Sequence, residues 1–454
     1  MKRQVRSPRT AVFPGRIAGP LILSVFLAAH GAVGERPVPA KDEGAEVAAL
    51  VAEALAKNPD LIAVRQEAAA ASARVRPAGA LPDPMLAVSY ENDGAKPSLG
   101  TEQMTRLQFM AQQALPFPGK LRLASEVAKK DAARIGTRPE RVSLTIEASV
   151  RRAYADLLKA RENLRLVDEQ LQTWRDIADV IRARYTAGMG TQQDLLRAQS
   201  EQTRLLQQKQ RDGAAEKTAL SEVRRLLFRP LDAPLPTEGR LAPEAMSPVP
   251  AAKGVLAKAL QITPELKDAV LAKERAKLAA DLARRNTKPD FVASVGYANR
   301  GGLPLMWSAG LGVSIPLWAG QKQRPLIAEA ESLFESASAA EVSLRRRIEA
   351  VTEERLIRIE ELAAEAKLDA EGVLVQDRLS VESALASYKT GSLPFVTVLE
   401  ALGTYYSDRR AAVDRLTGLI RAQADLYEFS PEAGASSAMV PSSPSATAPA
   451  AGRM

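Results

Sequence analysis

The chain has 454 residues, 26% of them charged and only 4% aromatic, with a formal net charge of +8. Its long stretches of Ala, Leu, Glu, Arg, Gln and Lys are typical of long helices and coiled coils rather than of a compact mixed core. It has no cysteine, which excludes disulfides and a thiol nucleophile. Its single histidine is His30, so the rest of the chain cannot form a Ser-His-Asp triad or an ordinary zinc site.

The first 34 residues are expected to form a secretory signal peptide. Basic residues precede an apolar run at 17–29, and the small residues Ala32-Val33-Gly34 suit cleavage. A transmembrane anchor is the alternative, but the run is short for a bilayer span. The segment has five basic and no acidic groups, so its removal leaves a net charge near +3, which does not indicate nucleic-acid binding. A linker at 35–44 follows, and without cysteine we expect no lipid anchor.

The first repeat, 45–228, is expected to contain a helix, two strands, a long helix, a Tyr-x-x-Gly turn and a returning helix. Their predicted ranges are 45–76, 84–92, 104–115, 119–185 and 192–228. The strands alternate with period two, whereas apolar residues recur in the long helix at spacings of four and three, as in a coiled coil. Gly136 and Pro139 predict a kink in it. The seam comprises Ile146, Val150, Ala153, Leu157, Ala160, Leu164, Val167, Leu171, Trp174, Ala178, Ile181 and Tyr185.

A proline-rich linker, 229–250, leads to a second repeat at 251–429. Its predicted helices and strands are 250–286, 290–299, 306–315, 320–388 and 394–428. Motifs of the first repeat return here: Pro82-Asp83 matches Pro289-Asp290, and Leu115-Pro116 matches Ile315-Pro316. A repeat of this length indicates a duplication. The last helix has a weaker seam with Leu399, Leu402, Tyr406, Val413, Leu416, Ile420 and Tyr427, interrupted by Arg409 and Gln423. Residues 430–454 are expected to be a disordered tail.

The strand at 306–315 has the clearest two-sided pattern, with Trp307, Leu311 and Val313 alternating with serine and glycine. Its length and single apolar face fit a membrane-spanning β-strand, although a half-buried strand of a soluble sheet has the same pattern. A secreted chain without another spanning segment favours the membrane. Exposed strand edges are not tolerated in lipid, and four strands are too few to close a barrel. Several protomers must then contribute to one barrel.

The element order, the duplication and the motifs LPFPGK at 115–120 and YTAGMGTQQDLLRA at 185–198 resemble the TolC-like outer membrane efflux proteins over about 45–428. LPDPML and PFPGK look most like the branch that serves heavy-metal efflux pumps. The resemblance implies a homotrimer: a membrane β-barrel with four strands per protomer, continued by a long periplasmic α-helical coiled-coil barrel. It also implies continuous long helices and short helices that stack in pairs, 45–76 with 192–228 and 250–286 with 394–428.

The resemblance further implies a passive exit duct in the outer membrane of a Gram-negative bacterium. An inner-membrane pump of the proton-driven resistance-nodulation-division type would expel small molecules or metal cations through a periplasmic adaptor. We expect no enzyme, no cofactor, no metal centre and no nucleic-acid partner. Two alternatives stay open: the outer membrane duct of a type I protein secretion system, and a soluble periplasmic coiled-coil adaptor or scaffold.

The two Tyr-x-x-Gly turns are the candidate functional site. Gly188 and Gly391 follow the last helical residues, where a left-handed C-cap requires glycine. The turns could serve only to join two antiparallel helices. The resemblance instead implies that they lie at the periplasmic tip, where they would form the adaptor-docking surface and the rim of the gate. The tip residues are Arg184, Tyr185, Gly188, Met189, Asp194, Leu195, Tyr388, Gly391, Leu393, Pro394 and Phe395.

Within this set each residue type has an expected role. Tyr185 and Tyr388 are expected to pack one turn against its neighbour. Asp194 is expected to interact favourably with the dipole of the returning helix, because it lies in the first turn of that helix. Apolar rim contacts are expected from Met189, Leu195, Leu393 and Phe395. Glu400 is expected to form an acidic ring in the lumen that favours cations. Leu393 and Pro394 stand where a charged latch of the family would have a basic residue, so no salt-bridged latch of that form is predicted.

Overall fold

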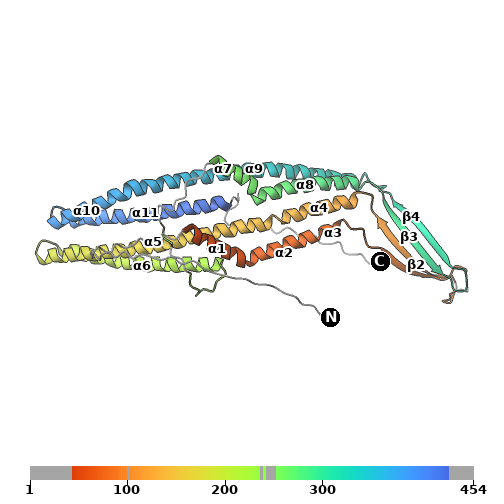
Figure 1. Ribbon diagram of the computed structural model, residues 1–454, viewed down its shortest axis with the longest axis horizontal. Coiled ribbons are helices and arrows are strands. Elements are labelled where there is room, and N and C mark those ends of the chain that lie inside the picture. Colours follow the sequence, from red (N-terminus) through yellow and green to blue (C-terminus); the bar gives the residue numbers. More distant parts are fainter. Residues whose placement is uncertain (1–42, 94, 100–102, 236–238, 242–251, 429–454) are drawn as a thin grey trace, which may run out of the picture. The chain divides into compact units, whose positions relative to one another are not determined.

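The computed structural model of the protein describes residues 43–93, 95–99, 103–235, 239–241 and 252–428 (Figure 1). The predicted signal peptide, the predicted tail and most of the predicted linker 35–44 lie outside these residues. The described chain is mainly helical and contains a four-stranded sheet. None of the helices in the described ranges combines the length and the continuous apolarity that a bilayer crossing requires.

Both halves of the chain contain the same kinds of element in the same order, as the duplication predicts. The first half consists of α1 (Glu43–Lys57), α2 (Pro59–Ala73), α3 (Val75–Ala78), β1 (Met85–Glu91), β2 (Arg106–Leu115), α4 (Lys120–Ile135), α5 (Arg138–Thr186) and α6 (Gln192–Leu226). The second half consists of α7 (Ala252–Ile262), α8 (Pro264–Arg285), β3 (Asp290–Asn299), β4 (Met306–Ser314), α9 (Gln323–Leu368), the π-helical turn η2 (Asp369–Val373), α10 (Leu374–Thr390) and α11 (Phe395–Glu428).

Proline divides the first helical segment of each half. Asn58 precedes Pro59 and caps α2, because its side-chain oxygen accepts hydrogen bonds from the amides two and three residues ahead, at 2.8 and 3.2 Å. Proline suits the first helical position, where its missing N–H is not needed. Thr263-Pro264 occupies the same place between α7 and α8. Each of these helical segments is therefore divided at its proline, as the interruption by Asn58-Pro59 in the sequence indicates.

Of the two long helical segments, which were expected to be continuous, the first has a short break and the second contains a π turn. In the first half, α4 ends at Ile135 and α5 begins at Arg138, in the region where glycine and proline predict a kink. In the second half, α9 leads into the π turn η2. There the buried Asp369 accepts two hydrogen bonds from Arg415 of α11, at 2.5 and 2.7 Å. The second long helix therefore runs without a break from Gln323 to Thr390, and the π turn only changes the hydrogen-bond spacing within it.

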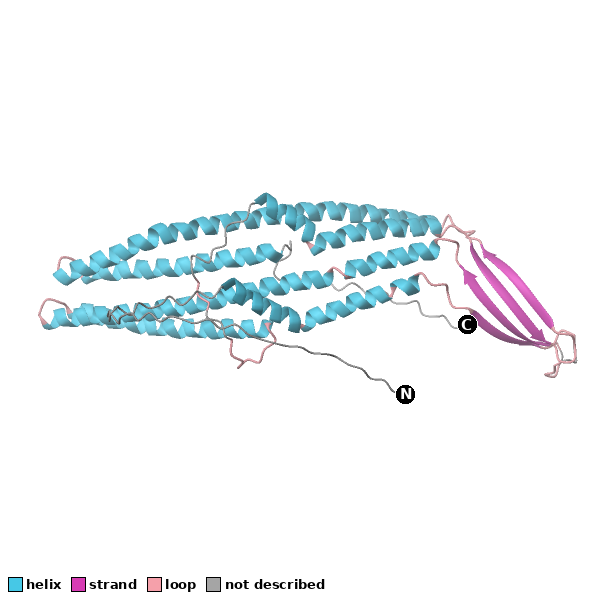
Figure 2. Ribbon diagram, viewed as in Figure 1, coloured by secondary structure: helices cyan, strands magenta, loops and turns pink. Residues whose placement is uncertain are grey.

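The four strands form one antiparallel sheet in the order β1-β2-β3-β4, so β1 and β4 are its edges (Figure 2). The register places Val88, Phe109, Tyr297 and Trp307 in one row across the sheet. Since side chains alternate between the two faces of a strand, this row defines an apolar face. Its members are Leu86, Val88, Tyr90, Leu107, Phe109, Ala111, Gln113, Leu115, Phe291, Ala293, Val295, Tyr297, Asn299, Trp307, Ala309, Leu311 and Val313.

The opposite face of the sheet carries mainly glycine, alanine, serine and glutamine. It also carries the ion pair between Arg106 and Glu91, at 2.6 Å, and the side chains of Met85, Met110 and Met306. Neither face is covered by the helices of the same chain: Leu311 on the apolar face is 88% exposed and Trp307 is 79% exposed. The sheet thus presents an uncovered apolar face and a more polar one.

Buried apolar clusters hold the helices together. The largest lies between α5, α6, α10 and α11, and another joins α1 and α2 to α5 and α6. Of the seam predicted in the first long helix, only Leu164 and Tyr185 are not fully buried. In the second half of α11 the buried residues are not those of the predicted seam. Leu416 and Ile420 of the seam are only partly buried, whereas Thr417 and Leu419 are buried. The reason is that α11 contacts both α5 and α9.

The described part of the predicted linker 229–250 is bound to the helices. Arg229 donates two hydrogen bonds to the Glu53 carboxylate of α1, at 2.6 and 2.8 Å. These bonds, with a further one from Lys57, lower the pKa of Glu53 to about 2, against the opposing effect of burial. Leu235 and Leu241 pack on the cluster beneath. This segment is therefore more than a spacer between the repeats.

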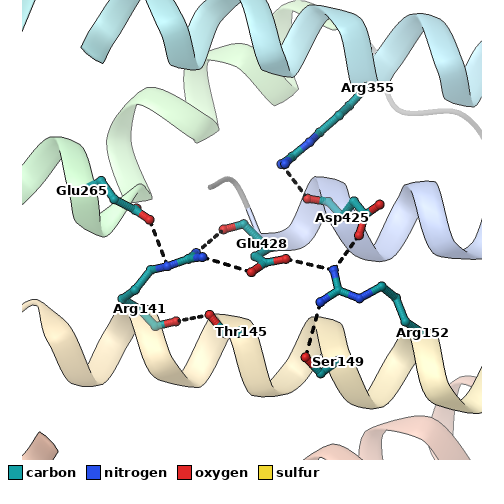
Figure 3. A network of polar contacts seen from close by, with 8 residues as sticks. All are labelled: Arg141, Thr145, Ser149, Arg152, Glu265, Arg355, Asp425 and Glu428. Carbon is teal, nitrogen blue, oxygen red and sulfur yellow. Dashed lines mark hydrogen bonds and ion pairs between the residues drawn. The ribbon is translucent and has the colours of Figure 1, made fainter. Parts of the chain in front are cut away.

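A network of charged side chains joins the two halves at the end of α11 (Figure 3). The side chain of Glu428 is only 3% exposed and pairs with Arg141, at 3.0 Å, and Arg152, at 2.9 Å, both from α5. Arg152 also pairs with Asp425, at 2.6 Å. Arg141 also pairs with Glu265 of α8, at 2.9 Å. The carboxylates of the second half thus hold two arginines of the first.

Arg355 of α9 completes this network by donating to the main-chain oxygen of Asp425, at 2.8 Å (Figure 3). Burial lowers the pKa of Arg355, and the charges of Asp425 and Glu428 oppose that change. Burial also acts to lower the pKa of Arg152, but hydrogen bonds to the same two carboxylates outweigh it and raise that pKa. The acidic groups of α11 therefore offset the cost of burying the positive charges of these arginines.

Replacing Glu428 with Gln leaves the two arginines without their shared charge. Removal of one partner from a buried ion pair costs about 3–5 kcal/mol, so we expect Glu428→Gln to lose about 3 kcal/mol of stability. Thermal unfolding followed by the helical circular dichroism signal in detergent measures this. The control is Glu222→Gln in α6, which removes the exposed pair with Arg225 and should cost under about 1 kcal/mol. Equal effects of the two changes would contradict the role of the network.

Candidate functional site

Two helical turns with the same backbone geometry lie at the end of the helices away from the sheet, one between α5 and α6 and one between α10 and α11 (Figure 1). Gly188 has a φ of 74° and Gly391 a φ of 82°. The amide after each glycine donates to the carbonyl five residues earlier, at 2.9 Å in both turns. These are the bonds of a Schellman C-cap, whose left-handed position favours glycine. Both glycines therefore have the conformation that the sequence predicts.

The turns differ where the returning helices begin. Thr191 caps α6, because its hydroxyl accepts a hydrogen bond from the Asp194 amide at 3.2 Å. Asp194 lies in the first turn of that helix, where a carboxylate is favoured by the helix dipole. The second returning helix begins at Phe395 directly after Pro394, and has no acidic residue in its first turn. The two tips are thus similar in backbone and different in charge.

Arg184 joins the two turns. One guanidinium nitrogen, Nη1, donates to the main-chain oxygen of Tyr388, and the other, Nη2, donates to the main-chain oxygen of Met189 at 3.2 Å. The same guanidinium lies 4.6 Å from the centre of the Tyr388 ring, a cation–π contact. One residue of the first turn therefore fixes the position of the second, a role that the sequence did not reveal.

The two tyrosines of the repeated motif occupy different environments. Tyr388 is 3% exposed, whereas Tyr185 is 44% exposed. Tyr388 packs against Arg184 of the neighbouring turn, whereas Tyr185 is exposed in the single chain, because the buried face of α5 ends at Ile181. Burial raises the pKa of Tyr388, the charge of Asp194 adds to this, and Arg184 opposes it.

Phe395 belongs to the core rather than to an exposed rim. It is 2% exposed and lies between Trp174 and Tyr388, with ring centroids 6.2 and 5.6 Å apart. The pair with Trp174 is edge-to-face, a favourable arrangement for aromatic rings. The expectation that Phe395 supplies rim contacts is therefore wrong. Leu195 is partly buried and packs against the same cluster.

Other apolar side chains around the turns are exposed. They are Tyr185, Met189, Leu196, Leu393 and Val396, with Met189 the most exposed at 68%. The sequence prediction included Met189 and Leu393 but missed Leu196 and Val396. These two directly follow the core-facing Leu195 and Phe395, so a helical-wheel reading of the returning helices would have placed them outward. We call these five residues the tip patch.

Glu400 is exposed in the single chain, and no hydrogen bond or ion pair of its side chain is present within the described residues. Pro394 is exposed as well. In the same described ranges, no three His, Cys, Asp or Glu side chains are grouped so that they could hold a metal ion. The chemistry available at the tip is therefore that of apolar contact and single charges.

The pattern of the outer membrane efflux protein family matches residues 50–227 and 255–430. The chain therefore belongs to the outer membrane efflux protein family. This confirms the family resemblance and the predicted fold class, a mainly α chain with a β part and duplicated halves.

Solved structures with the same fold include one protein described as forming a transmembrane channel and two described as outer membrane proteins. CusC is 17% identical, with a TM-score of 0.73, over 89% of this chain and 99% of CusC. The outer membrane channel MtrE of Neisseria gonorrhoeae, in its open state, is 17% identical with a TM-score of 0.71, over 85% of this chain and 88% of MtrE. VceC of Vibrio cholerae is 19% identical with a TM-score of 0.69, over 84% and 95%. No curated protein sequence matches the chain.

Alanine at position 391 tests the left-handed C-cap. Non-glycine residues in this region are disfavoured by about 1–2 kcal/mol, so Gly391→Ala should lower the free energy of unfolding by about 1 kcal/mol. Gly403→Ala, inside α11 with open space around it, is the control and should raise stability by up to about 1 kcal/mol. Chemical denaturation of the detergent-solubilised protein measures both. A change of the same sign in the two variants would refute the C-cap account.

Proposed function

We propose that this protein is the outer membrane channel of a tripartite efflux system. It would form a passive exit duct for small molecules or metal cations that an inner-membrane pump expels through a periplasmic adaptor. The observation that carries the proposal is the sheet, which has one uncovered apolar face and two free edges, β1 and β4. A protein in water would cover or blunt such a face and such edges.

Insertion in the outer membrane accounts for both features of the sheet. The apolar face would contact lipid, with Phe109, Tyr297 and Trp307 forming part of an aromatic girdle. The free edges must pair, because unpaired backbone groups are not tolerated in hydrocarbon. Four strands cannot close on themselves, since the smallest membrane barrels have about eight. A homotrimer that contributes four strands per protomer satisfies this requirement.

The helices would continue the barrel as a tunnel across the periplasm, with the paired turns at its far end. The tip patch supports a role for these turns in docking, because exposed apolar side chains on a monomer commonly mark contact sites. The adaptor is the partner that such a patch would bind, and the pump would be of the proton-driven resistance-nodulation-division type. Substrate choice would belong to the pump, and the resemblance of LPDPML to the heavy-metal branch favours metal cations.

The tip patch can be tested by introducing charge. We expect Met189→Glu and Leu393→Glu to abolish most rescue of a deletion strain exposed to copper, zinc and lipophilic drugs, because an apolar docking contact would gain a desolvated charge. Leu231→Glu is the control, since Leu231 is as exposed as Met189 and lies away from the turns. Equal outer membrane levels are verified by fractionation.

The same strain tests the functional class. Restored resistance with wild-type protein supports an efflux duct. Restored export of a secreted protein, with no change in resistance, would favour the type I secretion alternative. Normal rescue by both tip variants would refute adaptor docking at this patch.

Glu400 tests selectivity of the duct. A three-fold ring of Glu400 carboxylates in the lumen would attract cations, so Glu400→Ala should lower the cation preference of single channels in planar bilayers. The matched control is Glu382→Gln in α10, an exposed carboxylate on the other helix of the same hairpin. An unchanged ion preference in Glu400→Ala would remove the ring from the proposal.

A further inference from the structure

A buried lysine and an aspartate fasten the sheet to the helices in the middle of the chain. The Asp290 carboxylate, at the start of β3, accepts hydrogen bonds from the Phe117 amide at 2.7 Å and from Lys120 Nζ at 2.8 Å. Lys120 Nζ also donates to the main-chain oxygen of Lys288, at 2.8 Å. Lys120 is 8% exposed. This contact, which we call the junction clasp, connects the end of β2 in the first half to the start of β3 in the second.

The duplication gives the chain a second set of these groups. Asp83, in the Pro82-Asp83 that precedes β1, corresponds to Asp290, and the segment after Ile315-Pro316 corresponds to the one that contains Phe117 and Lys120. That segment is slightly longer, so Gln321 aligns with Lys120 and the nearest cation is Lys322, directly before α9. The second set therefore has the same chemistry, an aspartate and a lysine.

In the single chain this second set is not joined. Asp83 and Lys322 are both exposed, and neither side chain has a hydrogen bond or ion pair within the described ranges. The Leu317 amide, which corresponds to the Phe117 amide, bonds to its own neighbour, the Ile315 carbonyl, at 2.9 Å. The reason is topological: β2 and β3 are adjacent, whereas β1 and β4 lie at opposite edges of the sheet.

We infer that Asp83 of one protomer forms a second junction clasp with Lys322 of a neighbouring copy. The inference rests on the proposed oligomeric channel, in which β4 of one copy pairs with β1 of the next. Asp83 would there occupy the position that Asp290 has within the chain, and the Lys322 ammonium would reach it across the subunit boundary. The clasp is incomplete in any single protomer and is completed by the second copy.

The same correspondence fixes the register of the strands between copies. In the chain, Phe109 lies opposite Tyr297. In the duplication β4 corresponds to β2 and β1 corresponds to β3. The equivalent pairing between copies therefore places Ala309 opposite Tyr90 of the next copy. Leu311 then lies opposite Val88, and every such pair matches residues of the apolar face with each other. A shift by one residue would place polar against apolar side chains throughout, so the inferred register agrees with the two-faced pattern of both strands.

Charge substitutions test the clasp in the full-length protein in detergent. Trimers of the Asp83→Asn variant and of the Lys322→Gln variant should each dissociate roughly tenfold faster than wild-type trimers, because each interface loses one charge-assisted hydrogen bond. The exchanged pair, Asp83→Lys with Lys322→Asp, should recover most of that loss. Asp232→Asn, an exposed aspartate after α6, is the control. Unchanged dissociation in both single variants, or no recovery in the exchanged pair, would overturn the inference.

Cross-linking gives a second measurement of the register, and the absence of cysteine from the chain makes it specific. With a short thiol-reactive cross-linker, Ala87→Cys combined with Gly312→Cys should give covalent trimers, because these positions would lie directly opposite each other. A Cβ at Gly312 would meet only ordinary contacts, and Ala87 is an exposed position of β1. Ala87→Cys with Ser314→Cys, displaced by two residues on the same face, should react several-fold less.

The outcomes separate this inference from the proposed function. If the wild-type protein is monomeric in detergent and in membranes, the oligomeric channel itself is refuted. If it is trimeric but the displaced cysteine pair reacts better than the matched pair, the channel stands and the inferred register and clasp are refuted.

Discussion

Unpaired backbone groups at the edge of a sheet cannot be left in hydrocarbon, and the rest of this architecture depends on that constraint. A single chain supplies four strands with an apolar face and two open edges. In the proposed channel these edges pair between protomers, which requires rotational symmetry and places equal helices around one axis. The uncovered apolar face and the exposed apolar residues along the helices are then surfaces of an assembly rather than defects of a monomer.

Duplication of half a chain gave two copies of each structural device, and the copies have diverged where their surroundings differ. Tyr388 is buried against Arg184 and Phe395, while its counterpart Tyr185 is exposed. Asp290 is bonded within the chain, while its counterpart Asp83 has no side-chain partner among the described residues. In the inferred assembly, a contact within the chain in one half corresponds to a contact between copies in the other. The reason is that β1 and β4 are edge strands of the chain but would be paired in a closed barrel.

Buried charge also has a defined place in this fold. Glu428 and Asp425 hold Arg141 and Arg152 at the point where α11 lies between the two halves. Apolar packing could supply comparable stability, since burying charges is costly. Ion pairs with several hydrogen bonds each, however, require one relative placement of the helices. The network therefore fixes how the two halves fit together near the break between α4 and α5.

The element order, the approximate strand ranges, the duplication and the family could all be predicted from the amino-acid sequence, because they depend on local periodicity and on short motifs. It also placed Gly188 and Gly391 at left-handed C-caps, since only glycine suits that conformation. Only the folded chain shows that Phe395 is buried and Tyr185 exposed. The contacts of Arg184 with Tyr388 and of Lys120 with Asp290 likewise appear only in the three-dimensional structure. Those contacts join residues more than a hundred positions apart, and no local pattern encodes which of two similar segments will meet.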